Sequence, residues 1–231
     1  MKRFQSYFLW YCLILLTMQT ALAQDWANLQ RFQNENAQLP PPQANEKRVV
    51  FMGDSITEGW LNDPNSFFST QPHYINRGIG GQTTPQMLLR FRADVIQLQP
   101  KVVVILAGIN DIAGNTGPTT LEQIAGNIQS MAELAQAHHI KVVLASVLPA
   151  YSIPWRDELP AAEKVMALNQ QLKAYAKAND CLYLDYFSAM VNAENGLKAA
   201  LTYDGLHPNT AGYRVMQPLA EAALQQALAK E

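Results

Sequence analysis

The stretch RVVFMGDSITEG, residues 48–59, joins a short apolar run to a serine flanked by glycines. The run Arg48–Met52 is continuous rather than alternating, which is typical of a strand buried on both faces of a sheet. Ser55 follows it closely, so its hydroxyl is expected at the carboxyl edge of the sheet and at the start of a helix. This position suits a nucleophile whose substrate develops negative charge on oxygen. For an isolated serine before a helix, however, the role of an N-cap is the more common one.

Outward from this stretch, short apolar runs alternate with longer amphipathic ones. Further strands are predicted at His73–Asn76, Val102–Leu106, Lys141–Ser146 and Leu182–Leu184. Longer helices are predicted at Thr84–Leu98, Leu121–His138, Ala161–Ala178 and Thr210–Leu228. This alternation predicts one α/β domain with a five-stranded parallel sheet and helices on both faces. Ligands bind beyond the carboxyl ends of the strands in such sheets, so the residues after each strand are the candidates for a site.

Two of these strand ends carry residues that can stabilise an anion. Three of the four residues in the segment 78–81, GIGG, are glycines, which lets backbone amides approach a ligand closely. A phosphate-binding loop is not indicated, because no Gly-Lys-Ser/Thr follows and the third glycine of the dinucleotide fingerprint is absent. Asn110, after the third strand, can present its side-chain amide to the same space as the Ser55 hydroxyl, as in an oxyanion hole. A simple Asn-Asp turn is the alternative.

A histidine suited to act as a base lies far downstream, in the segment DGLHPN, residues 204–209. Among the four histidines, only His207 has a carboxylate three residues away, that of Asp204. This spacing can bring the carboxylate to the imidazole Nδ1–H within one turn, which leaves the other ring nitrogen to take a proton from a serine. A metal site would need more ligands than this segment offers.

The N-terminal region predicts export. Lys2 and Arg3 precede an apolar run over residues 7–16, and the segment 21–23, ALA, has the small-x-small pattern of a signal-peptidase site. The run is short and interrupted for a membrane anchor, so we expect residues 1–23 to be removed as a signal peptide. Residues 24–47 contain three consecutive prolines and are expected to form a lead-in segment. The remaining residues, 48–231, are expected to form the catalytic domain.

Composition narrows the possible partners. Removal of the signal peptide leaves 208 residues, enough for one domain with a core. It also leaves 15 basic against 19 acidic residues, a net charge of −4, which gives no electrostatic basis for binding nucleic acid or an anionic membrane. Cys181 is then the single cysteine, which excludes an intramolecular disulfide, and its apolar neighbours predict a buried thiol. The periplasm is the expected compartment, with secretion as the alternative and no stable membrane anchor after cleavage.

Four segments together resemble the SGNH-hydrolase superfamily, also called the GDSL esterase/lipase family, over about Val49 to Met216. They are the serine block at 53–57 with isoleucine in place of the name-giving leucine, the glycine block at 76–83, the Gly-x-Asn-Asp block at 108–111 and the Asp-x-x-His block at 204–207. In looser detail the chain is similar to the acetylhydrolase-like branch.

The resemblance implies a flavodoxin-like α/β/α sandwich and an ester hydrolase with a catalytic triad of Ser55, His207 and Asp204. It also implies an oxyanion hole formed by the backbone amides of Ser55 and Gly81 and the side chain of Asn110. The neighbouring Gly80 is the alternative to Gly81. The resemblance implies neither a metal nor an organic cofactor.

The substrate is predicted only as a class. The loop Tyr151–Arg156 after the fourth strand is expected to flank the site, and Trp60 is expected to border it. An indole and a guanidinium there can bind a sugar or a phospholipid head group, although Trp155 is equally well explained as a core or lid residue. No long apolar tunnel is indicated, which favours short-chain esters, acetyl above all, of a carbohydrate or other small molecule. The alternatives are lysophospholipids, acyl thioesters, acyl transfer to a sugar hydroxyl, and a non-catalytic carbohydrate-binding module.

Overall fold

The computed structural model describes residues 25–156 and 158–229, and the predicted signal peptide at 1–23 lies outside them. One parallel sheet is formed by strands β1 (Val49–Gly53), β2 (Tyr74–Gly78), β3 (Val102–Leu106), β4 (Lys141–Ala145) and β5 (Leu182–Leu184). The strand order is β2-β1-β3-β4-β5, which is the flavodoxin-like order. The predicted five-stranded parallel α/β fold is therefore confirmed.

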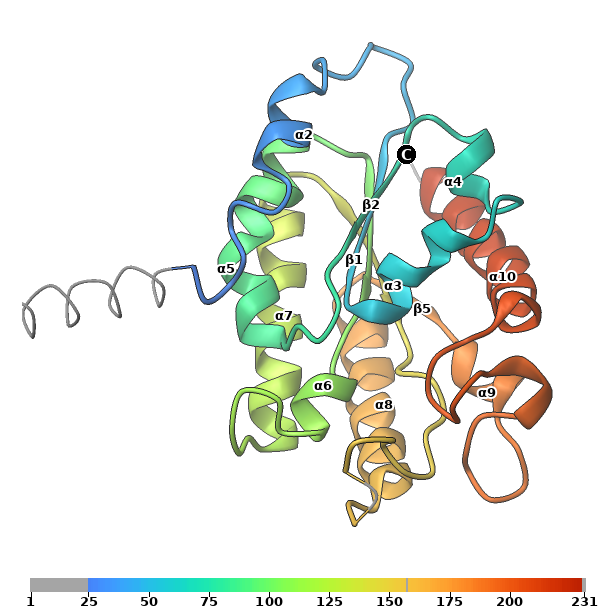
Figure 1. Ribbon diagram of the computed structural model, residues 1–231. Helices are drawn as coiled ribbons and strands as arrows, with labels where there is room; N and C mark the ends of the chain where they lie inside the picture. Colours follow the sequence, from blue (N-terminus) through green and yellow to red (C-terminus); the bar gives the residue numbers. More distant parts are fainter. Residues whose placement is uncertain (1–24, 157, 230–231) are drawn as a thin grey trace, which may run out of the picture.

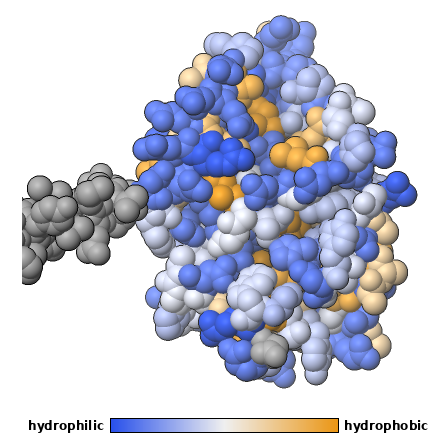
Figure 2. Space-filling view, in the orientation of Figure 1, coloured by the Kyte–Doolittle hydropathy of each residue, from blue (hydrophilic) through white to orange (hydrophobic). Residues whose placement is uncertain are grey.

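Helices cover both faces of the sheet, as Figure 1 shows. One face carries α5 (Thr84–Asp94), α7 (Leu121–Ala137) and α8 (Ala161–Ala178), whereas α10 (Thr210–Ala229) covers the other face with the short helix α3 (Ser55–Gly59). The remaining short helices are α2 (Gln33–Gln38), α4 (Phe67–Thr70), α6 (Ile109–Ile112) and α9 (Tyr186–Met190). Short 3₁₀ turns occur at Trp60–Asn62, Ile96–Leu98 and Ala199–Leu201. The three layers form an α/β/α sandwich. Its surface, seen from the same side in Figure 2, is largely hydrophilic with scattered hydrophobic side chains.

The central strands are apolar along their whole length because helices cover both of their faces. Every residue of β1 and β3 is buried. Burying one Val, Leu, Ile, Phe or Met side chain fully stabilises the fold by about 1.5–3 kcal/mol. The continuous apolar runs that predicted these strands are thus the middle layer of the core, and the polar residues that matter for function lie at the strand ends.

Helix α5 ends earlier than its apolar pattern predicts. The pattern predicts a helix to Leu98, but the helix ends at Asp94 and is followed by the 3₁₀ turn Ile96–Leu98. Val95 and Leu98 remain buried in this tighter turn, so the apolar spacing continues past the helix end. Gln99 then takes a left-handed conformation (φ 52°), and Pro100 directs the chain into β3.

The lead-in segment packs against the domain. Ala27 and Phe32 are buried, and the Phe32 ring lies 4.8 Å and 4.6 Å from the guanidinium carbons of Arg31 and Arg77. Asn36 accepts hydrogen bonds from Arg77 Nη2 and Nε at 2.7 and 3.0 Å and donates one to Asp94 at 2.7 Å. Residues 25–38 therefore belong to the same folded unit as α5 and β2.

The strand order places one crevice at the carboxyl edge of the sheet. Strand β1 lies between β2 and β3: the chain first adds β2 on one side of β1 and then crosses back to add β3 on the other side. This is the switch point at which ligands bind in doubly wound sheets. The segments after β1, β2 and β3 meet at this edge. None of the described helices is long and apolar enough to cross a membrane.

Candidate active site

Ser55 is the first residue of α3 and follows β1 after a single intervening residue. That residue, Asp54, caps the helix by accepting a hydrogen bond from the Ile56 amide at 2.9 Å. Gly53 permits the tight turn, because a β-carbon there would collide with the Thr57 side chain. The local sequence thus places the Ser55 hydroxyl at the sheet edge and at a helix start.

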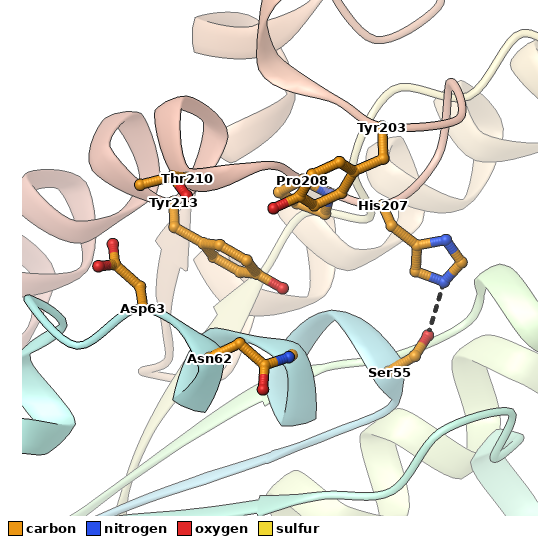
Figure 3. A pocket seen from close by; sticks show the side chains of 9 residues that line it. Ser55, Asn62, Asp63, Tyr203, His207, Pro208, Thr210 and Tyr213 are labelled. Carbon is orange, nitrogen blue, oxygen red and sulfur yellow. Dashed lines mark hydrogen bonds between the residues drawn. The ribbon is translucent and has the colours of Figure 1, made fainter.

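His207 and Asp204 complete a continuous chain of hydrogen bonds to Ser55. The Ser55 Oγ lies 3.0 Å from His207 Nε2, and this hydrogen bond is the dashed line in Figure 3. His207 Nδ1 lies 2.7 Å from Asp204 Oδ2. The second carboxylate oxygen of Asp204 accepts hydrogen bonds from the backbone amides of Leu206 and His207 at 2.9 and 2.8 Å. Gly205 supports this turn with a left-handed conformation (φ 87°). The structure therefore brings together all three residues of the predicted triad.

The charge on Asp204 is stabilised by this turn. Partial burial raises the pKa of the carboxyl group, but the hydrogen bonds from the His207 amide, the His207 ring and the Leu206 amide outweigh it. The resulting pKa lies below the ordinary value for aspartate. An ionised carboxylate at Nδ1 holds the imidazole in the tautomer that can accept a proton at Nε2.

The glycine loop, residues 78–81 at the end of β2, lies against Ser55. A β-carbon at Gly80 would stand 3.8 Å from the Ser55 β-carbon. The Gly80 amide donates to Glu58 Oε2 at 2.8 Å, whereas the Gly81 amide makes no hydrogen bond to any described residue. Gly81 has φ 75°, a conformation that favours glycine. Of the two glycines, Gly81 is thus the one with a backbone donor available to a substrate.

Asn110 is placed beside this loop in α6. Its side chain is buried, and Nδ2 donates to the Gln82 carbonyl at 3.0 Å. An amide nitrogen carries two hydrogens, so one N–H remains without an acceptor among the described residues. The structure therefore places the Asn110 side chain against the segment that follows the glycines after β2.

The sequence did not indicate the buried network that holds the glycine loop. Gln82 donates to the Ala27 carbonyl at 2.7 Å and accepts from Arg90 Nε at 2.6 Å. Arg90 is fully buried and pairs with Asp94 at 3.0 Å. It also donates to two carbonyls near the ends of β1 and β2, those of Gly53 and Arg77. A signal was present: Arg90 and Asp94 are four residues apart on the apolar face of the predicted helix.

Two further carboxylates are buried beneath the site. Burial raises the pKa of Asp54 to about 7, although the Ile56 amide and the charge of His207 lower it. Burial likewise raises the pKa of Asp111 to about 6, against hydrogen bonds from the Thr84 side chain and amide. Both carboxylates therefore bind protons more tightly than exposed aspartates.

A polar pocket of about 210 Å³ lies beside Ser55 and His207. The side chains that line it are shown in Figure 3; besides these two they are Asn62, Asp63, Tyr203, Pro208, Thr210 and Tyr213. Trp60 does not border the pocket directly, contrary to the prediction. It is buried and stacks on Tyr213 at a centroid distance of 5.4 Å. The space next to the nucleophile is small and polar.

Aromatic side chains surround the site on the solvent side. Trp155 is 46% exposed, and its ring centroid lies 6.3 Å from that of His207, so it is not a core residue. Tyr203, which lines the pocket, is more exposed still. Arg156 is exposed and pairs with Glu158 at 2.8 Å. The loop Tyr151–Arg156 thus flanks the site as predicted. Within residues 25–156 and 158–229 no group of three or more His, Cys, Asp or Glu side chains is arranged to hold a metal ion.

Comparison with known proteins identifies the family. A model of the GDSL-like Lipase/Acylhydrolase family matches residues 51–215. A GDSL-like lipase from Bacteroides thetaiotaomicron, known from its crystal structure, is 50% identical with a TM-score of 0.84, covering 87% of this chain and 98% of that one. Platelet-activating factor acetylhydrolase IB subunit alpha2 of Homo sapiens is 29% identical over 191 residues, 78% of this chain and 77% of that protein. An acetylxylan esterase of Geobacillus stearothermophilus is 24% identical over 200 residues, 74% of this chain and 90% of that protein.

The chain belongs to the GDSL-like lipase/acylhydrolase family, and it is a carboxylic ester hydrolase. The predicted family and enzyme class are therefore confirmed.

Proposed function

We propose that the chain is an exported serine esterase that hydrolyses short-chain esters, acetyl esters above all, through an acyl-enzyme on Ser55. The observation that carries the proposal is the chain of hydrogen bonds from Ser55 Oγ through His207 to Asp204, with distances of 3.0 and 2.7 Å. A serine hydroxyl bonded to an imidazole that is itself oriented by a carboxylate is the arrangement of an activated nucleophile.

In the proposed reaction His207 Nε2 takes the Ser55 proton as Oγ attacks the ester carbonyl. The negative charge that develops on the carbonyl oxygen is stabilised by the backbone amides of Ser55 and Gly81 and by the Asn110 side chain. The alcohol leaves with the proton from His207. Water then attacks the acyl-enzyme with His207 again as the base, which releases the acid and restores Ser55.

The surroundings of Ser55 support a short acyl group. The pocket beside it measures about 210 Å³, below the range of about 300–1,000 Å³ typical of sites for drug-sized ligands. The buried carboxylate of Asp63 lies in its lining, where an apolar chain would remove the charge from water at a cost. Two relatives are named as acetyl-ester hydrolases, one of them acting on xylan. These observations favour acetyl esters of small molecules or carbohydrates over long-chain lipids.

Export is proposed from the signal-peptide pattern at residues 1–23, with the periplasm as the compartment. Peptide sequencing of the mature N-terminus after expression in a Gram-negative host tests it directly. Cleavage after Ala23 is the expected result, whereas an intact N-terminus in the cytoplasmic fraction would contradict it.

The nucleophile is tested by Ser55→Ala. The variant is expected to lose hydrolysis of p-nitrophenyl acetate by at least about 10⁴-fold, because the acyl-enzyme cannot form. A fluorophosphonate probe is expected to label the wild-type protein at Ser55 and to leave the variant unlabelled. Wild-type turnover in the folded variant would show that the assignment is wrong.

The substrate class is tested by comparing kcat/KM over acetylated sugars, lysophospholipids, acyl thioesters and p-nitrophenyl esters of increasing chain length. Acetyl esters are expected to lead. A higher value for lysophospholipids or thioesters would overturn the acetyl preference. Product analysis with added sugar separates hydrolysis from transfer, since transfer would yield a new sugar ester in place of free acid.

A further inference from the structure

Asn115, in the loop that follows α6, joins three separate segments of the site. Its Nδ2 donates to Asn110 Oδ1 at 3.0 Å and to the Gly81 carbonyl at 3.2 Å. Its Oδ1 accepts the indole N–H of Trp155 at 3.2 Å. Every hydrogen-bonding group of this side chain therefore has a partner. The three partners lie after three different strands of the sheet.

These contacts fix the orientation of the Asn110 amide. The amide is held at both ends, because Nδ2 donates to the Gln82 carbonyl and Oδ1 accepts from Asn115. A rotation by 180° would place Oδ1 against the Gln82 carbonyl oxygen and Nδ2 against the Asn115 Nδ2. Both new pairings are repulsive, so the observed orientation is strongly preferred. It leaves the second Nδ2–H of Asn110 available to a ligand.

Asn115 is in turn held by Trp155. Its own rotation would turn Nδ2 towards the indole N–H and would remove both donors from Asn110 and Gly81. The Trp155 ring also lies over His207 and is half exposed. A single exposed asparagine therefore connects the aromatic loop that flanks the site with Asn110 and Gly81, two of the three residues that we propose as oxyanion donors.

We propose that Asn115 is a positioning residue for ester hydrolysis, which orients the Asn110 amide towards the oxyanion and is itself oriented by Trp155. This inference rests on the proposed function, because it requires Asn110 to act as an oxyanion donor. Asn115 contacts the donors and not the reacting atoms. Its effect is therefore expected in kcat, where stabilisation of the transition state appears, and not in KM.

Three substitutions distinguish an effect of Asn115 on the orientation of Asn110 from an effect of side-chain size. Asn115→Ala removes the bonds to Asn110 and Gly81 and is expected to lower kcat by about tenfold, less than the 10²–10³-fold typical for outright loss of an oxyanion donor. Asn115→Asp keeps the shape but cannot donate, so Asn110 is expected to turn its Nδ2 towards the new carboxylate, with a loss of about 10²-fold. Trp155→Phe keeps an aromatic ring and loses the N–H together with the second ring of the indole, so we expect a loss of about two- to threefold.

The decisive experiment is a double-mutant cycle with Asn110→Ala, measured as kcat for p-nitrophenyl acetate. If Asn115 acts through Asn110, the tenfold effect of Asn115→Ala is expected to fall to about two- to threefold in the Asn110→Ala background, the part that passes through Gly81. Equal losses in both backgrounds would overturn the inference, because a structural role is additive. So would an Asn115→Asp variant that is less impaired than Asn115→Ala.

The same measurements distinguish failure of this inference from failure of the proposed function. Wild-type kcat in Asn110→Ala would remove Asn110 from the oxyanion hole and overturn this inference, whereas the proposed function rests on Ser55, His207 and Asp204 and fails only if Ser55→Ala keeps wild-type turnover. A slow Asn110→Ala with wild-type kcat in Asn115→Ala would overturn only the role of Asn115. Asn179→Ala is the matched control, since Asn179 is exposed at the end of α8 and donates to the Tyr175 carbonyl at 2.9 Å. Its kcat is expected to be unchanged.

Discussion

The two halves of the proposed active site are held in place by different means. His207 is fixed within one short turn. Asp204, three residues away, accepts hydrogen bonds from both its ring Nδ1–H and its backbone amide. The proposed oxyanion hole is fixed by side chains from distant parts of the chain. Gln82 reaches Ala27, 55 residues away in sequence, and Arg90 reaches Gly53, 37 residues away.

This difference separates what is local from what depends on the whole fold. A substitution in the Asp204–His207 turn should change the chemistry and leave the fold intact, because its bonds close within the turn. A substitution in the network around Arg90 should instead reduce stability, because its bonds join β1, β2 and α5 beneath the site. Substitutions in the turn and in the network test this distinction.

The largest expected effect is that of Asp204→Asn on turnover. The amide oxygen can still accept the backbone amides of Leu206 and His207, so the turn is expected to survive. The carboxylate that orients His207 is lost, and kcat is expected to fall by about 10⁴-fold. Kinetics with p-nitrophenyl acetate and thermal unfolding by circular dichroism measure the two effects. A rate within tenfold of wild type would mean that another group orients His207.

The sequence predicted the local half of the site better than the distributed half. Asp204 and His207 were found from their spacing, and Ser55 from its place after the first strand. Gln82, Arg90 and Asn115 were missed, since their partners are remote in sequence and become neighbours only in the folded chain. The choice between Gly80 and Gly81 likewise depends on a contact from Glu58 that spacing does not reveal.

The secondary structure was likewise predicted best where the local sequence alone determines it. The strands Val102–Leu106 and Leu182–Leu184 were predicted to the residue, because each is a short, continuous apolar run. The end of α5 was missed by four residues, since a 3₁₀ turn buries the same side chains that a longer helix would bury. Trp60 was placed near the site, whereas it packs in an aromatic cluster with Phe51 and Phe67 that only the tertiary structure assembles.

The second prediction concerns Arg90→Leu. Asp94 would lose its ion-pair partner inside the protein, and two strand-end carbonyls would lose a donor. Breaking a buried ion pair costs about 3–5 kcal/mol, so the free energy of unfolding is expected to fall by that amount. Urea unfolding measures it. Arg92→Leu, an exposed position on the same helix, is the matched control and is expected to change stability by less than about 0.5 kcal/mol. Similar small values for both variants would mean that the network does not hold the site.

The third prediction compares the two buried aspartates, Asp54 next to Ser55 and Asp111 beside Thr84 at the start of α5. Burial raises both pKa values, to about 7 and about 6. Each folded carboxyl group therefore binds its proton more tightly than in the unfolded chain, so its contribution to stability is complete below about pH 4 and is lost as pH rises through the folded pKa. The largest slope for one such group is about 1.4 kcal/mol per pH unit.

Asp54→Asn keeps the acceptor for the Ile56 amide and cannot ionise. Its free energy of unfolding relative to wild type is therefore expected to rise between pH 4 and pH 7, and that of Asp111→Asn between pH 4 and pH 6. Taking the difference from wild type at each pH cancels the opposite contribution of Asp204, whose pKa is lowered. Urea unfolding at half-unit pH steps measures both curves. If the Asp54→Asn difference levelled off at lower pH than the Asp111→Asn difference, Asp111 would have the more strongly raised pKa. That result would contradict the order of burial of the two carboxyl groups.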